Sequence, residues 1–301
     1  MDLRAIGLGL AFAFMWSSAF TSARMIVADA PPLTALALRF LISGVLGIAV
    51  ARAMGQTWTL TRTQWRSTFV FGLCQNALYL GLFFVAMQRI EASLAAIIAA
   101  AMPLFVGFFG WIVFGDRLRP MAIIGLILGL GGVALIMGSR LSGGADGLGL
   151  ILCIIGTLAL TVATLSVRGA SSGGNVLMIV GLQMLVGAAA LAIAALLLET
   201  WEVTWSLRLI LAFLYTTLIP GLLATVTWFV LVNRIGAVRA ATFHFLNPVF
   251  GVAVASVLLA EKLGPLDMLG VAIVTAGILA VQLARQPAQL PAKLSRAARP
   301  G

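Results

Sequence analysis

Ten apolar segments, each about 20 residues long, fill the first 285 residues and most constrain how this chain can fold. Hydrophobic residues make up 62% of the sequence and charged residues 9%, and the mean hydropathy is +1.13. About 20 helical residues cross a hydrocarbon core about 30 Å thick. We therefore predict an all-α polytopic membrane protein with ten transmembrane helices, near residues 5–27, 33–53, 66–88, 92–115, 121–138, 147–167, 175–198, 208–232, 238–259 and 266–285.

The first segment contains "FMWSSAFTSAR" and starts close to Met1. It is too long and too polar for a cleaved signal peptide, so we expect it to remain in the protein. Lysine and arginine are retained on the cytoplasmic side of a membrane. With the N-terminus inside, thirteen basic residues fall in cytoplasmic segments and five in outer ones, which predicts that both termini are cytoplasmic.

The net charge of +10 does not indicate a nucleic-acid partner, because the basic residues are dispersed among short loops and form no basic stripe. The polar, basic segment 286–301 is predicted to be a disordered cytoplasmic tail. Cys74 and Cys153 lie within predicted helices and have no neighbours at metal-ligand spacing, so we expect structural cysteines, no metal and no cofactor.

The two halves of the chain are similar to each other. "RIEASLAAIIAAAMPLF", from Arg89, aligns without a gap to "RIGAVRAATFHFLNPVF", from Arg234, at an offset of 145 residues. This predicts a five-helix unit at 1–142 and a second at 143–285. Because five is odd, the second unit must be inverted in the membrane. Inverted repeats with a substrate site near the bilayer midplane are typical of secondary transporters.

Several motifs resemble the drug/metabolite transporter superfamily, specifically its ten-helix EamA-type exporters. They are "FMWSSAF", "ALRFLISG", "EASLAAIIAAAMPLFVGFFGWIVFGDRL" and "NRIGAVRAATFHFLNPVFGVAVASVLLAEKLGPLDMLG", and the resemblance covers about residues 1–285. Within the superfamily the chain looks most like bacterial aromatic amino-acid exporters, although Trp16-Ser17-Ser18 departs from the commoner Trp-Gly-Ser. The resemblance implies metabolite export along a path lined by helices 1, 3, 4, 6, 8 and 9.

All nine acidic residues lie at or beyond the ends of the predicted helices. The interiors of the predicted helices therefore contain no carboxylate that could exchange a proton for a cationic drug within the membrane. The same distribution argues against an enzyme that needs paired acids or metal ligands. Proton coupling would have to depend on His244 or a tyrosine, so exchange and facilitated diffusion are equally compatible.

Pro103 and Pro248 occupy matching positions in helices 4 and 9, where a proline frees a backbone carbonyl. A kink there indicates either helix packing or a transport site. His244, the only histidine, shares a helix face with Asn247, and its counterpart in the first unit is Ala99. Imidazole and amide groups suit a neutral or zwitterionic ligand.

Helix 3 places Asn76, Tyr79 and Phe83 on one face, while the hydroxyl of Thr161 in helix 6 can bond either substrate or its own helix. Arg39 can snorkel outward, bond freed carbonyls or bind a substrate carboxylate. The candidate substrate-binding residues are Trp16, Ser17, Asn76, Tyr79, Phe83, Ala99, Met102, Thr161, Tyr215, Trp228, His244 and Asn247, and the candidate hinges are Pro103, Pro220 and Pro248.

From these observations we expect a secondary transporter of a bacterial inner membrane that exports small metabolites by alternating access, amino acids first and aromatic ones preferred. The alternatives are export of drugs, nucleosides or other metabolites, and, in other classes, a channel or a membrane enzyme. The partners expected are a small-molecule substrate and the lipid bilayer, with monomer and homodimer both left open.

Overall fold

A computed structural model describes residues 3–116, 118–166, 173–235 and 237–285. These residues contain ten helices that are long and apolar enough to cross a membrane, five in each half of the chain. Within the described ranges the secondary structure is helical, with no strand. The ten-helix, all-α architecture predicted from hydropathy is thus confirmed, while the tail at 286–301 lies outside the described residues.

Six of the ten spans are single helices, and four are interrupted. The single helices are α1 Leu3–Asp29, α2 Pro32–Ala53, α7 Pro120–Ser142, α8 Gly147–Ser166, α9 Val176–Leu198 and α14 Pro265–Arg285. The interrupted spans are α3 Arg62–Phe71, η1 Gly72–Tyr79 and α4 Leu80–Ala86; α5 Ala92–Ala100 and α6 Met102–Phe114; α10 Leu207–Thr216, η2 Thr217–Leu223 and α11 Ala224–Ile235; and α12 Ala237–Thr242, η3 Phe243–Leu246 and α13 Asn247–Leu259.

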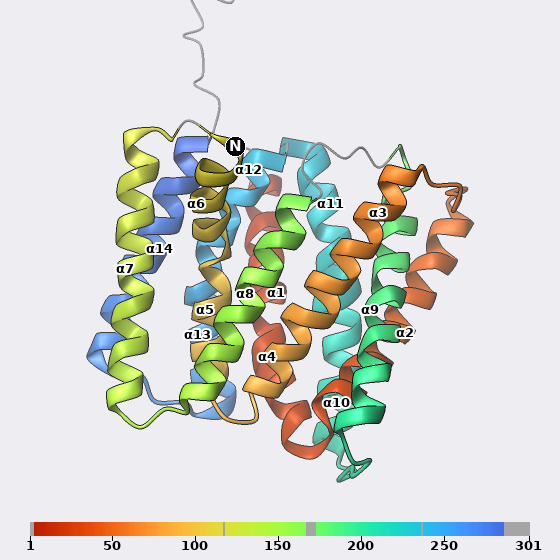
Figure 1. The fold of residues 1–301 in the computed structure, drawn as a ribbon, viewed down its shortest axis with the longest axis horizontal. Helices are drawn as coiled ribbons and strands as arrows, with labels where there is room; N and C mark the ends of the chain where they lie inside the picture. Colours follow the sequence, from red (N-terminus) through yellow and green to blue (C-terminus); the bar gives the residue numbers. More distant parts are fainter. Residues whose placement is uncertain (1–2, 117, 167–172, 236, 286–301) are drawn as a thin grey trace, which may run out of the picture.

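Helices from the two halves pair at both edges of the bundle. In Figure 1, α7 lies beside α14 at one edge, and α2 lies beside α9 at the other. Glycines allow the α7–α14 backbones to touch, because a Cβ added at Gly277 would lie 2.5 Å from the Cα of Gly129. Close approach of small residues is a usual way to pack helices in lipid, where burial from water contributes little.

The interruptions occur at corresponding positions in the two halves. Spans 4 and 9 break immediately before Pro103 and Pro248, each of which lies in the first turn of the helix that follows. Spans 3 and 8 each contain a π-helical segment, η1 and η2. Such segments carry wider i to i+5 turns and are frequent at functional sites. Pro220 lies inside η2, whereas η1 contains no proline.

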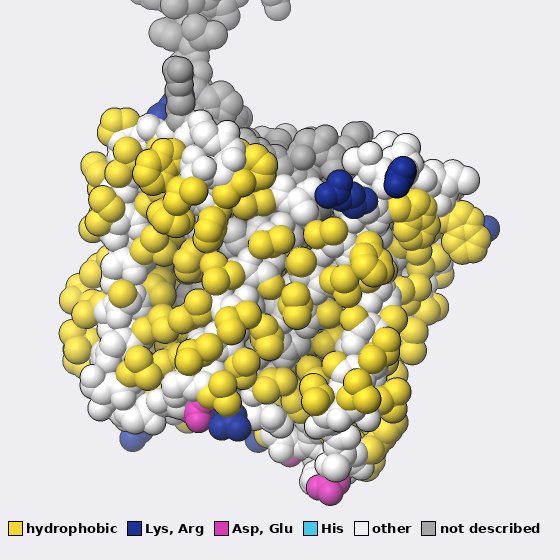
Figure 2. Space-filling model, viewed as in Figure 1, with side chains coloured by type: hydrophobic (Ala, Val, Ile, Leu, Met, Phe, Trp, Pro, Cys, Tyr) yellow, Lys and Arg dark blue, Asp and Glu magenta, His cyan; other side chains and the backbone are white. Residues whose placement is uncertain are grey.

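On the face of the bundle that Figure 2 shows, an apolar band lies between two rims that carry charged side chains. We call the rim near residue 3 the N face and the rim near residues 30–31 the far face. Large apolar side chains are highly exposed, for example Leu196 at 85% and Val257 at 81%. A soluble domain rarely exposes so large an apolar surface, whereas in a membrane this surface faces lipid.

On the far face, glutamates of the second half cap helices of the first. Glu199, after α9, accepts hydrogen bonds from the backbone N–H groups of Leu33 (2.7 Å) and Thr34 (2.8 Å) at the start of α2. Glu261, after α13, accepts bonds from Ala92 (2.8 Å) and Ser93 (2.9 Å) at the start of α5. A carboxylate at a helix N-terminus satisfies free N–H groups and complements the helix dipole.

Candidate transport site

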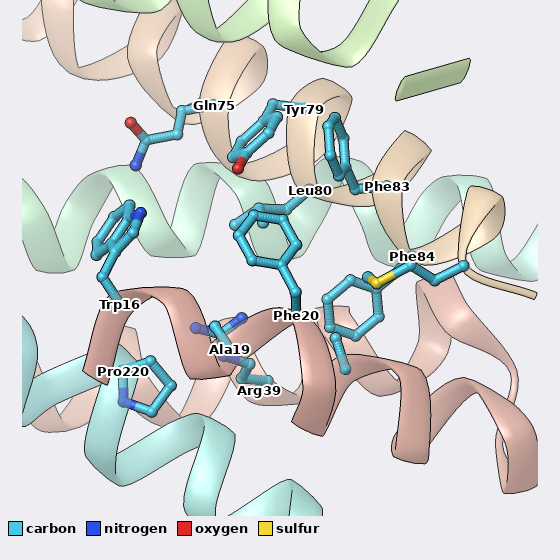
Figure 3. Close-up of a pocket in the computed structure, with 12 residues that line it drawn as sticks. Trp16, Ala19, Phe20, Arg39, Gln75, Tyr79, Leu80, Phe83, Phe84 and Pro220 are labelled. Atoms are coloured by element: carbon cyan, nitrogen blue, oxygen red, sulfur yellow. The ribbon is translucent and has the colours of Figure 1, made fainter. Parts of the chain in front are cut away.

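A small cavity lies inside the bundle between α1, α2, span 3 and span 8, with a volume of about 50 Å³. Figure 3 shows the side chains that surround it. Arg39 of α2, Gln75 and Tyr79 of η1, and Trp16 of α1 supply its polar groups. The remaining lining residues are Ala19, Phe20, Ala23, Leu80, Phe83, Phe84, Met87 and Pro220.

Trp16 also belongs to a cluster of aromatic rings that joins the two halves of the chain. His244 packs edge-on against Phe12, with ring centroids 5.3 Å apart, and against Trp16 at 6.4 Å. Trp228 contacts His244 at 5.3 Å and Phe12 at 4.7 Å. Phe12 and Trp16 come from α1, while Trp228 and His244 come from α11 and η3. Trp16 therefore connects this aromatic cluster with the cavity.

The side chains of Asn247 and His244 form a hydrogen bond with each other. The distance from Asn247 Nδ2 to His244 Nδ1 is 2.9 Å, and the neighbouring Oδ1 of Asn247 is buried without a hydrogen-bond partner among the described residues. The buried hydroxyl of Ser17 on α1 also has no partner in the described part of the chain. A buried polar atom without a hydrogen-bond partner destabilises the folded protein unless a ligand or water molecule bonds to it.

Close packing of small residues brings α13 to α1 and α5 at this depth. A Cβ added at Gly251 would lie 2.5 Å from the Cβ of Ala96 and 3.9 Å from that of Ser17. Gly251 is thus the point at which spans 9, 4 and 1 meet. A side chain at this position would separate the helices that hold Asn247 and Ser17.

The structure places the other predicted site residues in several environments. Tyr79 and Phe83 line the cavity, whereas Asn76 is buried against Gly187 of α9 and is not among the lining residues. Ala99 is buried within α5, and Met102 accepts a long contact of 3.9 Å from the Thr164 hydroxyl. The Tyr215 hydroxyl bonds Ser18 at 2.7 Å.

The hydroxyl of Thr161 bonds to its own helix, which is one of the two alternatives that the sequence left open. Its hydroxyl donates to the carbonyl oxygen of Thr157, 2.8 Å away in its own helix, and Thr157 and Thr164 bond back in the same way. The threonine stripe of α8 therefore satisfies itself in this conformation.

Eight of the twelve residues that line the cavity were not among the sequence candidates, and they include Arg39, Gln75 and Phe20. The repeat alignment could have indicated Gln75, because the offset of 145 residues aligns it with the candidate hinge Pro220. Both residues line the cavity. Arg39 was noted as an intramembrane cation, but the sequence left its direction open. Phe20 carried no signal that distinguishes it from the many other apolar residues.

A charged network lies on the far face, away from the cavity. Arg140 donates to Glu91 at 2.7 Å and to Asp267 at 2.9 and 3.0 Å. Burial raises the pKa of the Glu91 carboxyl. The positive charge of Arg140 lowers this pKa, whereas the negative charges of Glu261 and Asp267 raise it further. By contrast, the Gly149 backbone N–H lowers the pKa of the half-buried Asp146, which also pairs with Arg89 at 3.3 Å.

Within the described ranges no group of three His, Cys, Asp or Glu side chains is arranged to hold a metal ion. The polar groups of the site are instead donors and acceptors of the kind that bind an organic molecule. The site combines aromatic surface with a few hydrogen-bonding groups from both halves of the chain.

Comparison with known proteins identifies the family. The model of the EamA-like transporter family matches the chain twice, over residues 3–138 and 147–283. The transporter YvbV of Bacillus subtilis (strain 168) is 27% identical over 268 residues, 89% of this chain and 88% of that protein. The inner membrane transporter YedA of Escherichia coli (strain K12) is 28% identical over 287 residues, 94% of this chain and 92% of that protein.

Two further matches are more limited in what they show. The aromatic amino acid exporter YddG of Ancylobacter novellus is 29% identical over 136 residues, which is 45% of this chain and 47% of that protein. One crystal structure matches with a TM-score of 0.67 at 22% identity, covering 95% of this chain and 99% of the other, and shows the shared fold. With ten spans among its described residues and two matched ranges that together cover most of its length, the chain is a multi-pass membrane protein that belongs to the EamA-like transporter family.

Proposed function

We propose that this transporter exports amino acids, aromatic ones in preference, by alternating access through the centre of the bundle. The observation that carries the proposal is the aromatic cluster around His244, which shares Trp16 with the cavity. Aromatic rings that meet edge to face offer a substrate ring further contacts of the same kind. The cluster draws on both halves of the chain, as expected for a site between two repeats.

The hydrogen-bonding groups beside the cluster support a zwitterionic ligand. The unpartnered Oδ1 of Asn247 can accept an N–H from a substrate ammonium group, and Ser17 Oγ can accept a second. These acceptors are neutral, so they leave no buried charge when the substrate departs. The partial similarity to an aromatic amino acid exporter favours the same class of substrate.

The transport cycle that we propose uses two units, residues 1–142 and 143–285, which exchange conformations. Pro103 and Pro248 are the hinges of spans 4 and 9, and Pro220 is a third hinge within η2. We place the N face and both termini in the cytoplasm of a bacterial inner membrane, with segment 286–301 as a cytoplasmic tail. Fusion of alkaline phosphatase to the C-terminus tests this orientation, and an active fusion would contradict it.

Counterflow is the test of the substrate. Purified protein is reconstituted in liposomes that are loaded with unlabelled phenylalanine, and uptake of labelled phenylalanine is followed. We expect saturable uptake that exceeds the internal equilibrium level and is inhibited by tryptophan and tyrosine. Protein-free liposomes are the control for leakage, and thermal unfolding of the reconstituted sample shows that the protein is folded.

The other function classes give different results in the same experiment. Absence of counterflow in folded protein would overturn the aromatic assignment and favour drugs, nucleosides or other metabolites, which the same assay tests as competitors. Flux that does not saturate and needs no internal substrate would indicate a channel. Chemical conversion of substrate in detergent, without a gradient, would indicate an enzyme and contradict the proposal that this chain is not one.

A further inference from the structure

Arg39 is a buried cation without a counter-charge in the described structure. Its side chain starts two turns inside α2, the residue is 7% exposed, and its Nε has no hydrogen-bond partner among the described residues. The ion pairs formed by Arg89 and Arg140 lie on the far face and do not include Arg39. Its guanidinium packs over Phe40, 5.2 Å from the ring centroid. A charge held in this way within a membrane indicates a functional role.

Other hydrogen-bond donors surround the same space. The Tyr79 hydroxyl, the Trp16 indole N–H and the Gln75 amide belong to residues that line the cavity with Arg39 (Figure 3). No lining residue is acidic. Indole and guanidinium groups only donate hydrogen bonds, so the cavity is richer in donors than in acceptors. This pattern fits an anion.

The size of the cavity limits which part of a substrate it holds. A volume of about 50 Å³ accommodates on the order of four water molecules. It therefore has room for a carboxylate in this conformation but not for an aromatic ring. Phe20, Phe83 and Phe84 form apolar walls, and surroundings of low polarity strengthen a charge-assisted hydrogen bond.

We propose that Arg39 binds the carboxylate of the transported molecule, with Tyr79 and Trp16 as further donors. The inference rests on the proposed function and deepens it by assigning the residue that binds the substrate carboxylate. Arginine suits this role because its planar fork binds both carboxylate oxygens and stays charged when buried. The substrate's ring then lies outside the 50 Å³ cavity, on the side of Trp16 that faces the aromatic cluster.

A purely structural role for Arg39 is the alternative that the experiment must separate. A Cβ added at Gly221 would lie 3.7 Å from Nη2 of Arg39 and 3.2 Å from the carbonyl oxygen of Thr216. The guanidinium thus lies next to η2, whose proline leaves backbone carbonyls without their usual donors. If Arg39 served only to support η2, its removal would affect all ligands alike.

The first experiment measures inhibition of phenylalanine counterflow by two analogues. One is 3-phenylpropionate, which has the carboxylate without the ammonium, and the other is phenethylamine, which has the ammonium without the carboxylate. In the unmodified protein we expect 3-phenylpropionate to be the stronger inhibitor. In Arg39→Gln, we expect about a 10- to 150-fold rise in the phenylalanine KM and loss of the preference for 3-phenylpropionate. Arg39→Lys retains part of both.

Arg52→Gln is the matched control, because it removes the same charge from an exposed position at the other end of α2. We expect unchanged inhibition in this variant. Equal preference for 3-phenylpropionate in Arg39→Gln and unmodified protein would overturn the inference. If Arg39→Gln does not fold, Tyr79→Phe removes one donor while keeping the ring, and we expect about a 3- to 10-fold weaker inhibition by 3-phenylpropionate.

The second experiment separates this inference from the proposed function. Thermal unfolding of the purified protein is followed with 3-phenylpropionate, phenethylamine or the neutral 3-phenylpropanol. Stabilisation by 3-phenylpropionate alone, lost in Arg39→Gln but kept in Arg52→Gln, would support the Arg39 site even if phenylalanine counterflow fails. Stabilisation that is equal in both variants, or that is absent from unmodified protein, would overturn it.

Discussion

The two halves of this transporter share a backbone plan but differ in side-chain chemistry. Spans 4 and 9 break before a proline at the same repeat position, yet Ala99 and Met102 in the first half correspond to His244 and Asn247 in the second. Spans 3 and 8 both contain a π-helical segment, although Gln75 stands where the second half has Pro220. Symmetry therefore extends to the helix breaks and not to the side chains that we propose as substrate contacts.

This difference teaches which property each half must retain. A cycle that exchanges the conformations of two halves needs helices that bend at equivalent places. A substrate with distinct ends needs unlike groups on its two sides. We therefore expect substitutions at contacts that both halves share to change mainly the stability of the protein. Substitutions at residues that differ between the halves should change mainly the affinity for substrate.

The largest effect is expected at the glycines that join α7 to α14. Gly277 and its repeat counterpart Gly132 both lie in the contact. A Cβ at Gly277 would meet backbone at 2.5 Å, whereas one at Gly132 would meet the Ile273 side chain at 3.0 Å and backbone only at 3.1 Å. We expect Gly277→Leu to lower the free energy of unfolding by about 3 kcal/mol and Gly132→Leu by about 1 kcal/mol. Thermal unfolding in detergent measures both values.

Gly131→Leu is the control for this pair, because nothing lies within 4 Å of a Cβ at that position. We expect it to leave the unfolding temperature unchanged. A loss at Gly131 equal to that at Gly277 would show that the contact between the halves does not cause the effect, because Gly→Leu by itself raises helix propensity.

The next effect concerns the helix caps, which differ in charge between the halves. Glu261→Gln removes one carboxylate that accepts two backbone hydrogen bonds from α5, and we expect a cost of about 2 kcal/mol. On the N face, the Gln56 amide oxygen accepts one longer bond of 3.1 Å from Met178 at the start of α9. Gln56→Ala should therefore cost about 1 kcal/mol or less, and a larger loss than in Glu261→Gln would contradict this ranking.

Asn247 and its repeat counterpart Met102 test whether residues that differ between the halves determine substrate affinity. We expect Asn247→Ala to raise the phenylalanine KM about tenfold, because it removes an acceptor and breaks the bond to His244. Met102→Ala, at the corresponding position in the first half, should have a smaller effect on KM. Counterflow measured over a range of substrate concentrations gives both constants, and equal effects would mean that affinity also follows the repeat.

The smallest effect is the pH dependence of stability on the far face. The pKa of Asp146 is lowered, so its contribution is present above its ordinary pKa and is lost as the pH falls through the lowered one. The pKa of Glu91 is raised, so its contribution is present below its ordinary pKa and is lost as the pH rises through the raised one. Asp146→Asn should reduce the acid-side loss, and Glu91→Gln the loss at higher pH.

Unfolding temperatures measured between pH 3 and pH 8 test both carboxyl groups. Glu202→Gln is the control for removal of a charge, because Glu202 lies in an exposed loop of the same face. A change in Asp146→Asn with the opposite sign would mean that the hydrogen bond from Gly149 is not the main influence on that group.

The sequence predicted the spans and the proline breaks because both depend on local composition. It predicted the faces of the helices less well. An α-helical period groups Asn76 with Tyr79 and Phe83, but η1 widens the turn and directs Asn76 to Gly187 instead of the cavity. Nothing in the residues of η1 distinguishes it from an α-helix, whereas η2 contains Pro220. The direction of Arg39 depends on the packing of four spans, which one sequence does not specify.

The caps at Glu199 and Glu261 also bear on how the protein is made. Glu261 follows the backbone N–H group of Ala92 by 169 residues. At a synthesis rate of about 5 to 20 residues per second, α5 enters the membrane about 10 to 30 s before its cap exists. During that interval its first N–H groups depend on water and lipid head groups. The first half produced alone would therefore lack the carboxylates that cap α2 and α5.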